Sequence, residues 1–301
     1  TWATSSLSPQ LACGWLEDED LFSRTYPMDL RPQGQDIIRT WLFSTVVRAN
    51  LEFGALPWQH AGISGWILDP DHKKMSKSKG NVVTPMGLLE KYGSDAVRYW
   101  AASARLGLDA TFDEAQMKIG RRLAIKVLNA SKFALTMGGE NTALDLDPAR
   151  ISLELDRSVI AELRRVISVA SDALAAYDHS RALEVTESFF WTFCDDYLEL
   201  VKERAYNRDG KWAEDEAVSA RTVLAIVIDT VIRLLAPFLP YVTEEVWSWY
   251  RPGSIHRAPW PTLEGLEDVA GDPEVLRAAS AALIALRRVK SEAKVSPRTP
   301  F

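Results

Sequence analysis

Residues 73–81 read Lys-Lys-Met-Ser-Lys-Ser-Lys-Gly-Asn and follow an apolar stretch, Ile-Ser-Gly-Trp-Ile-Leu, at residues 63–68. The apolar stretch predicts a short buried strand that delivers the lysines to a loop at its carboxyl end, where open α/β sheets bind ligands. Lysine ammonium groups on flexible stems suit a polyphosphate, and Gly80 with Asn81 permits the turn that follows. The alternative is a solvated basic turn, because charge runs usually lie on the surface. The loop is not a Walker A loop, since no GxxxxGK followed by Ser or Thr is present.

The composition is that of an ordinary soluble globular protein, with 47% hydrophobic and 25% charged residues over 301 positions, and it predicts two domains. A formal net charge of −6 argues against diffuse attraction to nucleic acid, so RNA contacts need a local basic stripe. The two cysteines, Cys13 and Cys194, supply neither a disulfide framework nor a CxxC pair. We therefore expect a reducing compartment and no structural zinc.

No apolar run reaches about 18 residues and no signal peptide leads the chain, so we expect a cytoplasmic protein. The first residue is not methionine, which suggests a piece of a longer protein. A short strand is expected at residues 28–30, after an irregular connecting loop at residues 7–26 that contains an acidic cluster. A helix should then begin at residues 33–36 and end near Gly54, since its apolar residues recur at helical spacing.

The start of that helix carries three residues with two interpretations each. Asp36 either caps the helix or accepts hydrogen bonds from a ribose above the sheet. Ile37 and Trp41 lie one turn apart on one helix face, so they form either a core pair or the wall of a pocket.

Two short helices after the lysine loop predict a junction between domains. Thr84 should cap the first of them, with Pro85 at its first helical position, and the helix should stop near Gly93. Ser94 and Asp95 open the second.

Long helices without strand signals follow Asp113. In residues 112–135, one side of the helical wheel is apolar and predicts a buried face; it holds Ile119, Leu123, Val127, Ala130 and Ala134. The other side is basic and ends in an aromatic ring; it holds Lys118, Arg122, Lys126, Asn129 and Phe133. This second stripe either binds RNA phosphates and an unstacked base or is a solvated face with Phe133 partly in the core.

Further amphipathic helices are predicted at residues 153–177, 180–206 and 214–235. In the second of them a set of apolar residues should point inward: Phe189, Phe190, Phe193, Tyr197, Leu198 and Val201, with Cys194 a small buried hydrophobe. Thr243 should cap another helix. A last helix, at residues 272–294, ends in a basic cluster that either meets RNA or complements the helix dipole; the cluster is Arg287, Arg288, Lys290 and Lys294.

Several short motifs spread over nearly the whole chain resemble one family. They are Thr1-Trp2, Gly34-x-Asp36-Ile37-Ile38-x-x-Trp41, KMSKS at residues 74–78, Tyr92-Gly93-x-Asp95-Ala96-x-Arg98, Asn129-Ala130-Ser131-Lys132-Phe133, and Leu235-Ala236-Pro237-Phe238-Leu239-Pro240 with Thr243-Glu244-Glu245. The chain resembles the class I aminoacyl-tRNA synthetases of the valine, isoleucine and leucine branch, and within that branch it is most similar to the valyl enzymes.

The resemblance implies site residues. Lys74, Lys77 and Ser78 would close on the ATP triphosphate as catalytic residues, and Gly34 and Asp36 would touch the adenosine. Trp2, Ile37 and Trp41 would line the valine side-chain pocket. The stripe from Lys118 to Phe133 would bind tRNA.

The resemblance also implies a fold and domains. The fold is a partial Rossmann-type parallel sheet, the second half of a class I catalytic domain, followed by an all-α bundle. Residues 1–82 would belong to the catalytic domain, 83–114 to a helical junction, 115–260 to the anticodon-binding bundle, and 261–301 to a C-terminal linker and helix.

The implied function is a valine–tRNA ligase reaction through valyl-adenylate, with ATP and Mg²⁺, valine and tRNA as partners, no membrane, no metal site, and a monomeric chain. An HxGH-type motif and an editing insertion would lie before Thr1, so we expect the isolated chain not to activate valine. The alternatives are a tRNA-binding module without catalysis and the isoleucine enzyme.

Overall fold

Two parallel strands form the centre of the first of two units in a computed structural model, which describes residues 2–137 and 144–296. The first unit holds Thr1–Thr84 and Ala104–Asp113, and the second holds Pro85–Ser103 and Glu114–Phe301. The segment between the lysine loop and the long helices is therefore divided between the two units.

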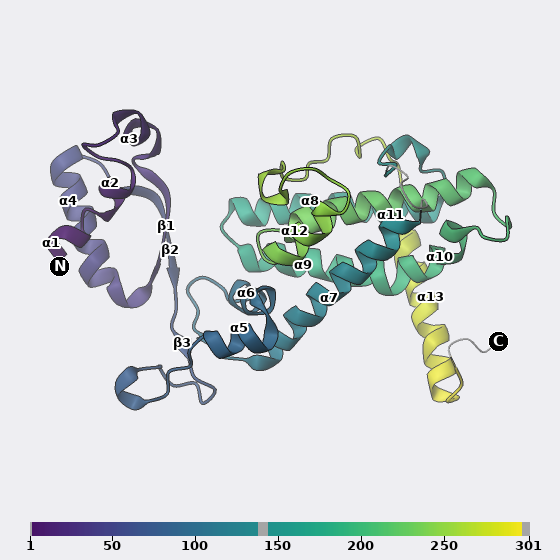
Figure 1. Cartoon of the computed structure of the whole chain (residues 1–301), viewed down its shortest axis with the longest axis horizontal. Helices are drawn as coiled ribbons and strands as arrows, with labels where there is room; N and C mark the ends of the chain where they lie inside the picture. Colours follow the sequence, from purple (N-terminus) through teal and green to yellow (C-terminus); the bar gives the residue numbers. More distant parts are fainter. Residues whose placement is uncertain (1, 138–143, 297–301) are drawn as a thin grey trace. The chain divides into compact units, whose positions relative to one another are not determined.

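In the first unit, β1 (Met28–Gly34) pairs in parallel with β2 (Trp58–Ser64), and Gly34 stands opposite Ser64 at their carboxyl ends. The crossover between them begins with a 3₁₀ turn, η1 (Gln35–Ile37), and a π turn, η2 (Ile38–Leu42). It continues as α4 (Phe43–Phe53) and ends at Gly54, which has a φ of 65°. A parallel pair needs such a crossover. The predicted strand at residues 28–30 and the helix that ends near Gly54 are thus confirmed (Figure 1).

The prediction of one buried strand at residues 63–68 was wrong. β2 ends at Ser64, and a separate strand, β3 (Ile67–Leu68), pairs in parallel with β4 (Ala110–Thr111). Gly65 marks the break, because a Cβ there would lie 2.3 Å from the carbonyl oxygen of Leu108. Ile67 is 51% exposed. The chain therefore leaves the β1–β2 sheet at this glycine to pair with a later segment.

The stretch at residues 7–26 is not the predicted irregular loop either. It forms α2 (Ser8–Ala12) and α3 (Glu19–Thr25), after a first turn, α1 (Trp2–Ser5). The side chain of Asp18 caps α3 by accepting the Leu21 N–H at 3.0 Å. Carboxylates at a helix start complement its dipole, so the acidic cluster is a helix N-terminus.

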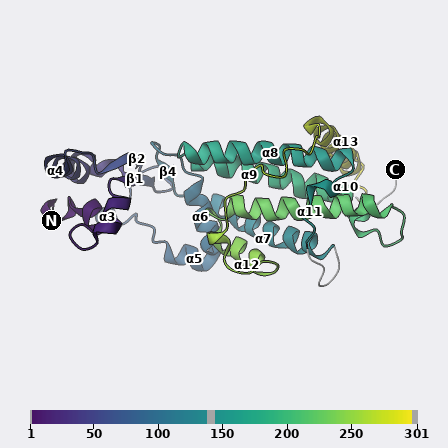
Figure 2. The same cartoon turned by 90° about the horizontal axis from the view of Figure 1, so that it is seen from above.

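The second unit is helical (Figures 1 and 2). Its α-helices are α5 (Met86–Tyr92), α6 (Ser94–Ala102), α7 (Glu114–Thr136), α8 (Glu154–Ala175), α9 (His179–Thr192), α10 (Leu198–Tyr206), α11 (Glu214–Leu235), α12 (Pro240–Ser248) and α13 (Pro273–Glu292). The shorter turns are η3 (Lys77–Lys79) of the first unit and η4 (Pro148–Arg150) and η6 (Ile255–Arg257) of the second. A π turn, η5 (Phe193–Tyr197), joins α9 to α10 without a break.

The bundle core lies where α8, α9 and α11 run side by side, with α7 against α11. The aromatic residues predicted to point inward from residues 180–206 are buried, as is Cys194, so these predictions are confirmed. Burial raises the pKa of the Cys194 thiol to about 12. The fold class, a small parallel sheet followed by a helical bundle, is confirmed as well. No helix among residues 2–137 and 144–296 combines the length and apolarity that crossing a membrane requires.

Two family motifs meet inside the helical unit. Asp95, at the start of α6, accepts the backbone N–H groups of Tyr241 at 3.1 Å and Val242 at 2.8 Å, and so caps α12. Arg98 donates to the carbonyl of Pro237 at 2.7 Å. The Tyr92-to-Arg98 motif therefore holds the proline-rich entry to α12, which is a structural task.

Two predicted caps were wrong. Thr243 lies inside α12, fully buried, and its hydroxyl donates to the carbonyl of Leu239 at 2.9 Å. The helix begins earlier, at Pro240, because Asp95 supplies the acceptor from another helix. Thr84 does not cap α5, whose N-cap is Pro85. The end of α5 at Gly93, with a φ of 87°, is confirmed.

Candidate nucleotide loop and RNA-facing surface

The lysine loop leaves β3 through a tight turn built on Asp69. The backbone N–H of Asp69 donates to the carbonyl of Lys73 at 2.9 Å, and Leu68 and Lys74 form an antiparallel bridge. One carboxylate oxygen of Asp69 accepts the N–H groups of Asp71 at 3.0 Å and Lys73 at 2.8 Å. Such Asx turns fix the backbone locally. The loop thus starts from a rigid base, although its strand has only two residues.

Asn81 closes the far end of the loop onto that base. Its amide nitrogen donates to the other oxygen of Asp69 at 2.8 Å, and its amide oxygen accepts the N–H of Ser76 at 2.9 Å. The Asn81 amide and the Lys73 N–H together hold the pKa of Asp69 below its usual value, because they favour the charged form. Gly80 has a φ of 68°, which confirms the predicted turn. We call this arrangement, Asp69 with Asn81, the latch.

Inside the latch, the three predicted phosphate-binding residues are in different situations. The Lys74 ammonium lies 4.1 Å from the centre of the Trp66 indole ring. The Ser78 hydroxyl is exposed and lies 3.2 Å from that of Ser76. The side chain of Lys77 lies outside the described part of the structure, although its backbone begins η3.

Gly34 and Asp36 lie at the carboxyl end of β1, beside the end of β2. The helical segment has Gly34 as its N-cap, and within the described residues no side chain caps it. Asp36 is exposed and folds back over Gly34, since a Cβ on Gly34 would lie 2.8 Å from a carboxylate oxygen of Asp36. The capping interpretation of Asp36 is therefore wrong, and its contact with a ribose stays a prediction.

The predicted valine-pocket residues are only partly described. Trp41 is 7% exposed; it stacks on Trp58 at 5.7 Å and donates its indole N–H to the carbonyl of Ser5 at 2.8 Å. The Arg31 guanidinium lies 4.0 Å from the centre of the Trp41 ring. Ile37 is half-buried. The side chain of Trp2 lies outside the described residues, so the pocket stays a prediction.

The predicted RNA stripe of α7 divides into an exposed part and an engaged part. Lys118, Arg122 and Asn129 are exposed. Lys126 instead pairs with Asp195 of η5 at 2.8 Å. Phe133 is half-buried and meets Tyr206 edge-on at 5.6 Å. Lys126 and Phe133 therefore already have partners inside the bundle.

Sequence reasoning missed a cluster of rings and cations after α10. The Arg208 guanidinium lies 4.4 Å from the centre of the Tyr206 ring, and Tyr206 and Trp212 are both exposed. The side chain of Asn207 bonds the N–H and the carbonyl of Trp212, each at 3.0 Å, and closes the turn. The available signal was a pair of aromatic residues, Tyr206 and Trp212, on either side of Arg208 and Lys211. We call residues 206–212 the tip turn.

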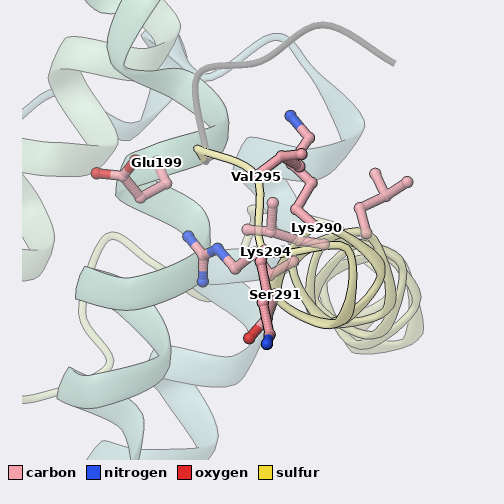
Figure 3. Close-up of a pocket in the computed structure, with 8 residues that line it drawn as sticks. Glu199, Lys290, Ser291, Lys294 and Val295 are labelled. Carbon is pink, nitrogen blue, oxygen red and sulfur yellow. The ribbon is translucent and has the colours of Figure 1, made fainter.

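The basic end of α13 borders a groove of about 550 Å³ opposite Glu199 of α10 (Figure 3). Arg287 donates to the carbonyl of Asp195 at 2.7 Å and pairs with Asp196 at 3.5 Å. Arg288 pairs with Glu292 at 2.8 Å on the surface. Arg287 therefore anchors α13 to η5. Within the described ranges, no group of His, Cys, Asp and Glu residues could hold a metal ion.

Comparisons with known protein families give matches over both parts of the chain. Residues 1–113 match the family described as tRNA synthetases class I (I, L, M and V). Residues 156–301 match the Anticodon-binding domain of tRNA ligase. The chain therefore belongs to the class I tRNA synthetases.

Individual relatives are more specific. The chain is 63% identical over 300 residues to the valine–tRNA ligase of Thermobifida fusca (strain YX), a match that covers 99% of this chain and 33% of that protein. It is 58% identical over 321 residues to the valine–tRNA ligase of Bifidobacterium longum (strain NCC 2705), covering 100% of this chain and 35% of that protein. The chain thus spans about a third of the length of these relatives.

A solved structure shares the fold. It is the ternary complex of Agrobacterium radiobacter K84 agnB2 LeuRS with tRNA and LeuAMS. The match has a TM-score of 0.71 and 21% identity, and covers 87% of this chain and 32% of that chain.

Proposed function

We propose that this chain is the part of a valine–tRNA ligase that carries the lysine loop and the RNA-binding bundle. In this reaction the valine carboxylate attacks the α-phosphate of ATP and pyrophosphate leaves; a terminal hydroxyl of tRNA then attacks the valyl carbonyl of the adenylate, and AMP leaves. The observation that carries the proposal is the latched lysine loop after β3, in a chain 63% identical to a valine–tRNA ligase. The isoleucine enzyme is less well supported, because the relatives described above are valine–tRNA ligases.

The lysine loop acts on the phosphates. Lys74 and Lys77 neutralise the charge that develops on the departing pyrophosphate, and the Ser78 hydroxyl donates a hydrogen bond to it, since fixed cations and donors are most effective where charge appears in the transition state. Gly34 and Asp36 contact the adenosine at the end of β1. ATP brings Mg²⁺ on its phosphates.

The valine side chain lies against Trp2, Ile37 and Trp41. Trp41 suits a wall, because its ring is already fixed by Trp58 and by its bond to Ser5. A rigid aromatic wall selects a small branched side chain by shape. We place the reaction in the cytoplasm, with the ligase acting as a monomer.

The helical unit binds tRNA. Lys118, Arg122 and Asn129 of α7 are exposed and reach phosphates, and the rings of the tip turn offer stacking surfaces for unpaired bases. Lys126 and Phe133 belong to the same stripe but contribute less, because their side chains have partners in the bundle.

A chimera tests the catalytic part. The matching 300 residues of the Thermobifida fusca ligase are replaced by this chain, and valine-dependent ATP–pyrophosphate exchange is measured. We expect exchange in the chimera, a strong reduction to a measurable residual rate in Lys74→Ala, and its retention in Lys132→Ala, a matched exposed lysine of α7. Robust exchange in Lys74→Ala would contradict the assignment.

RNA binding by the chain alone tests the second part and the alternative of a tRNA-binding module. We expect Lys118→Ala and Tyr206→Ala to weaken tRNA binding, with Arg181→Ala, whose guanidinium pairs with Glu184 on α9, as the control. Loss of one phosphate contact should lower the salt slope of log K by about 0.7–0.9 for Lys118→Ala. An inactive chimera together with a chain that binds tRNA would favour the module.

A further inference from the structure

Trp66 occupies the break between β2 and β3, and its backbone is fixed on both sides. Its N–H donates to the Asp109 carboxylate at 2.7 Å, and its carbonyl accepts the N–H of Ala110 at 2.9 Å. Gly65 before it abuts Leu108 so closely that no side chain fits there. The indole therefore projects from a rigid point two residues beyond the carboxyl end of β2, while 36% of its surface stays exposed.

Lys74 rests on this ring, whereas Lys91 and Lys126 lie near the aromatic rings of Tyr92 and Trp191 but are also paired with carboxylates. Lys126 pairs with Asp195 at 2.8 Å and Lys91 with Glu114 at 2.7 Å. Within the described part of the chain, the Lys74 ammonium lies 4.1 Å from the centre of the Trp66 indole ring, and no carboxylate forms an ion pair with it.

The difference matters for binding an anion. A carboxylate would hold the ammonium but cancel its charge and compete with a phosphate for its N–H groups. An aromatic face attracts the ammonium through its quadrupole and leaves the net charge in place. The ring thus restricts the conformations of the long, flexible Lys74 side chain without reducing its attraction for phosphate.

We propose that Trp66 is a positioning residue for Lys74, which holds the ammonium at the carboxyl end of the parallel strands before a triphosphate arrives. This inference rests on the proposed function, since it concerns the same phosphate-binding loop. The latch fixes the backbone of the loop, and Trp66 fixes the ammonium group of Lys74.

Kinetics of the chimera test the role. A cation–π contact at an exposed site is worth enough to change a rate about two- to fivefold, so Trp66→Leu should lower kcat for pyrophosphate exchange by that factor. Trp66→Phe should retain most of the rate, and the KM for valine should not change. Trp66→Glu should be slower than Trp66→Leu, because it holds Lys74 but neutralises it.

A double-mutant cycle separates positioning from a general effect on the fold. In the Lys74→Ala background, Trp66→Leu should cause no further loss. Equal losses in both backgrounds, or a Trp66→Glu chimera as fast as Trp66→Phe, would overturn the positioning role while leaving the proposed function intact. No exchange in the unsubstituted chimera would overturn both.

The contact itself is tested on the chain without any activity. After incorporation of 5-fluorotryptophan, the ¹⁹F resonance that is absent from Trp66→Phe reports on Trp66. We expect this resonance to shift in Lys74→Ala and on addition of tripolyphosphate, and to stay in place in Lys73→Ala, whose ammonium lies 3.7 Å from Asp71 instead. A resonance that ignores Lys74→Ala would overturn the inference.

Discussion

Removing the Arg204 guanidinium should destabilise the helical unit more than any surface substitution. The guanidinium of Arg204 on α10 donates two parallel hydrogen bonds to the carboxylate of Asp156 on α8, at 2.6 and 2.8 Å. The same carboxylate accepts the hydroxyls of Tyr197 at 2.8 Å and Ser219 at 2.5 Å. The network joins α8, η5, α10 and α11, and the side chains of Asp156 and Arg204 are 0% and 6% exposed. Arg204→Met keeps the apolar stem and removes the charge.

The expected loss follows from the burial of the partner. Arg204→Met leaves the Asp156 carboxylate charged, buried and without its counter-ion, and breaking such a pair costs about 3–5 kcal/mol. For a unit of this size each kcal/mol shifts the melting temperature by about 2–4 °C, so the loss should be about 6–20 °C. Asp156→Asn combined with Arg204→Met should recover part of this loss, because the amide oxygen still accepts a hydroxyl and no charge stays buried.

Thermal unfolding of the chain, followed by helical circular dichroism, measures these shifts. Arg277→Met is the matched control, since its pair with Glu274 on α13 is largely exposed, with the two side chains 64% and 68% exposed, and is worth only about 0–1 kcal/mol. A melting temperature for Arg204→Met within about 2 °C of the parent chain would refute the reasoning. The reasoning would also be refuted if the melting temperature of the double variant fell by more than the sum of the falls in the two single variants.

Three further predictions concern other sites. Burial raises the pKa of the Cys194 thiol from 9.0 to about 12, so its contribution to stability is complete below pH 9 and is lost as the pH rises toward 12. Urea unfolding near pH 8 and pH 10 should show a loss of about 1.4 kcal/mol in the parent that Cys194→Ala lacks; equal pH dependence in both would contradict it. Asn81→Ala opens the latch and should slow exchange in the chimera about tenfold without changing the melting of the helical unit; an unchanged kcat would show that the latch is dispensable. Asp95→Ala removes the cap of α12 and should lower the melting temperature by about 2–4 °C, whereas Asp95→Asn should not; identical melting of the two variants would exclude capping.

Hydrophobic periodicity predicted the helical unit well and the first unit less well. Long helices such as α8 and α11 repeat an apolar face many times, so residues 153–177 and 214–235 were predicted to within three residues. The stretch at residues 63–68 is mostly apolar, and a run of six residues cannot reveal that Gly65 turns the chain toward a later segment. Its pairing depends on residues 110–111, which are distant in sequence.

The same limit separates the site features that the sequence predicts from those that only the structure shows. The lysine loop and Gly80 are local features, and the sequence predicted both. Thr243 was misread as a cap, because the true acceptor is Asp95, 146 positions from Tyr241 along the chain. The latch joins Asp69 to Asn81 across the loop, and Lys74 meets Trp66 across a turn. These contacts depend on backbone geometry that no spacing rule contains.

The distribution of charge contacts connects the two units to their proposed ligands. In the helical unit, Asp195 accepts Lys126 through its carboxylate and Arg287 through its carbonyl, so the acidic turn η5 binds the protein's own cations. A cation with a carboxylate partner adds little to the attraction of an RNA phosphate, because its charge is already compensated. The basic surface of α7 that is available to RNA is therefore smaller than the stripe from Lys118 to Phe133 that the sequence predicted. In the lysine loop the carboxylate of Asp69 is directed to backbone N–H groups and an amide, and Lys74 is left to an uncharged ring. A chain with a net charge of −6 can thus present local positive charge at the loop where we propose that a polyphosphate binds.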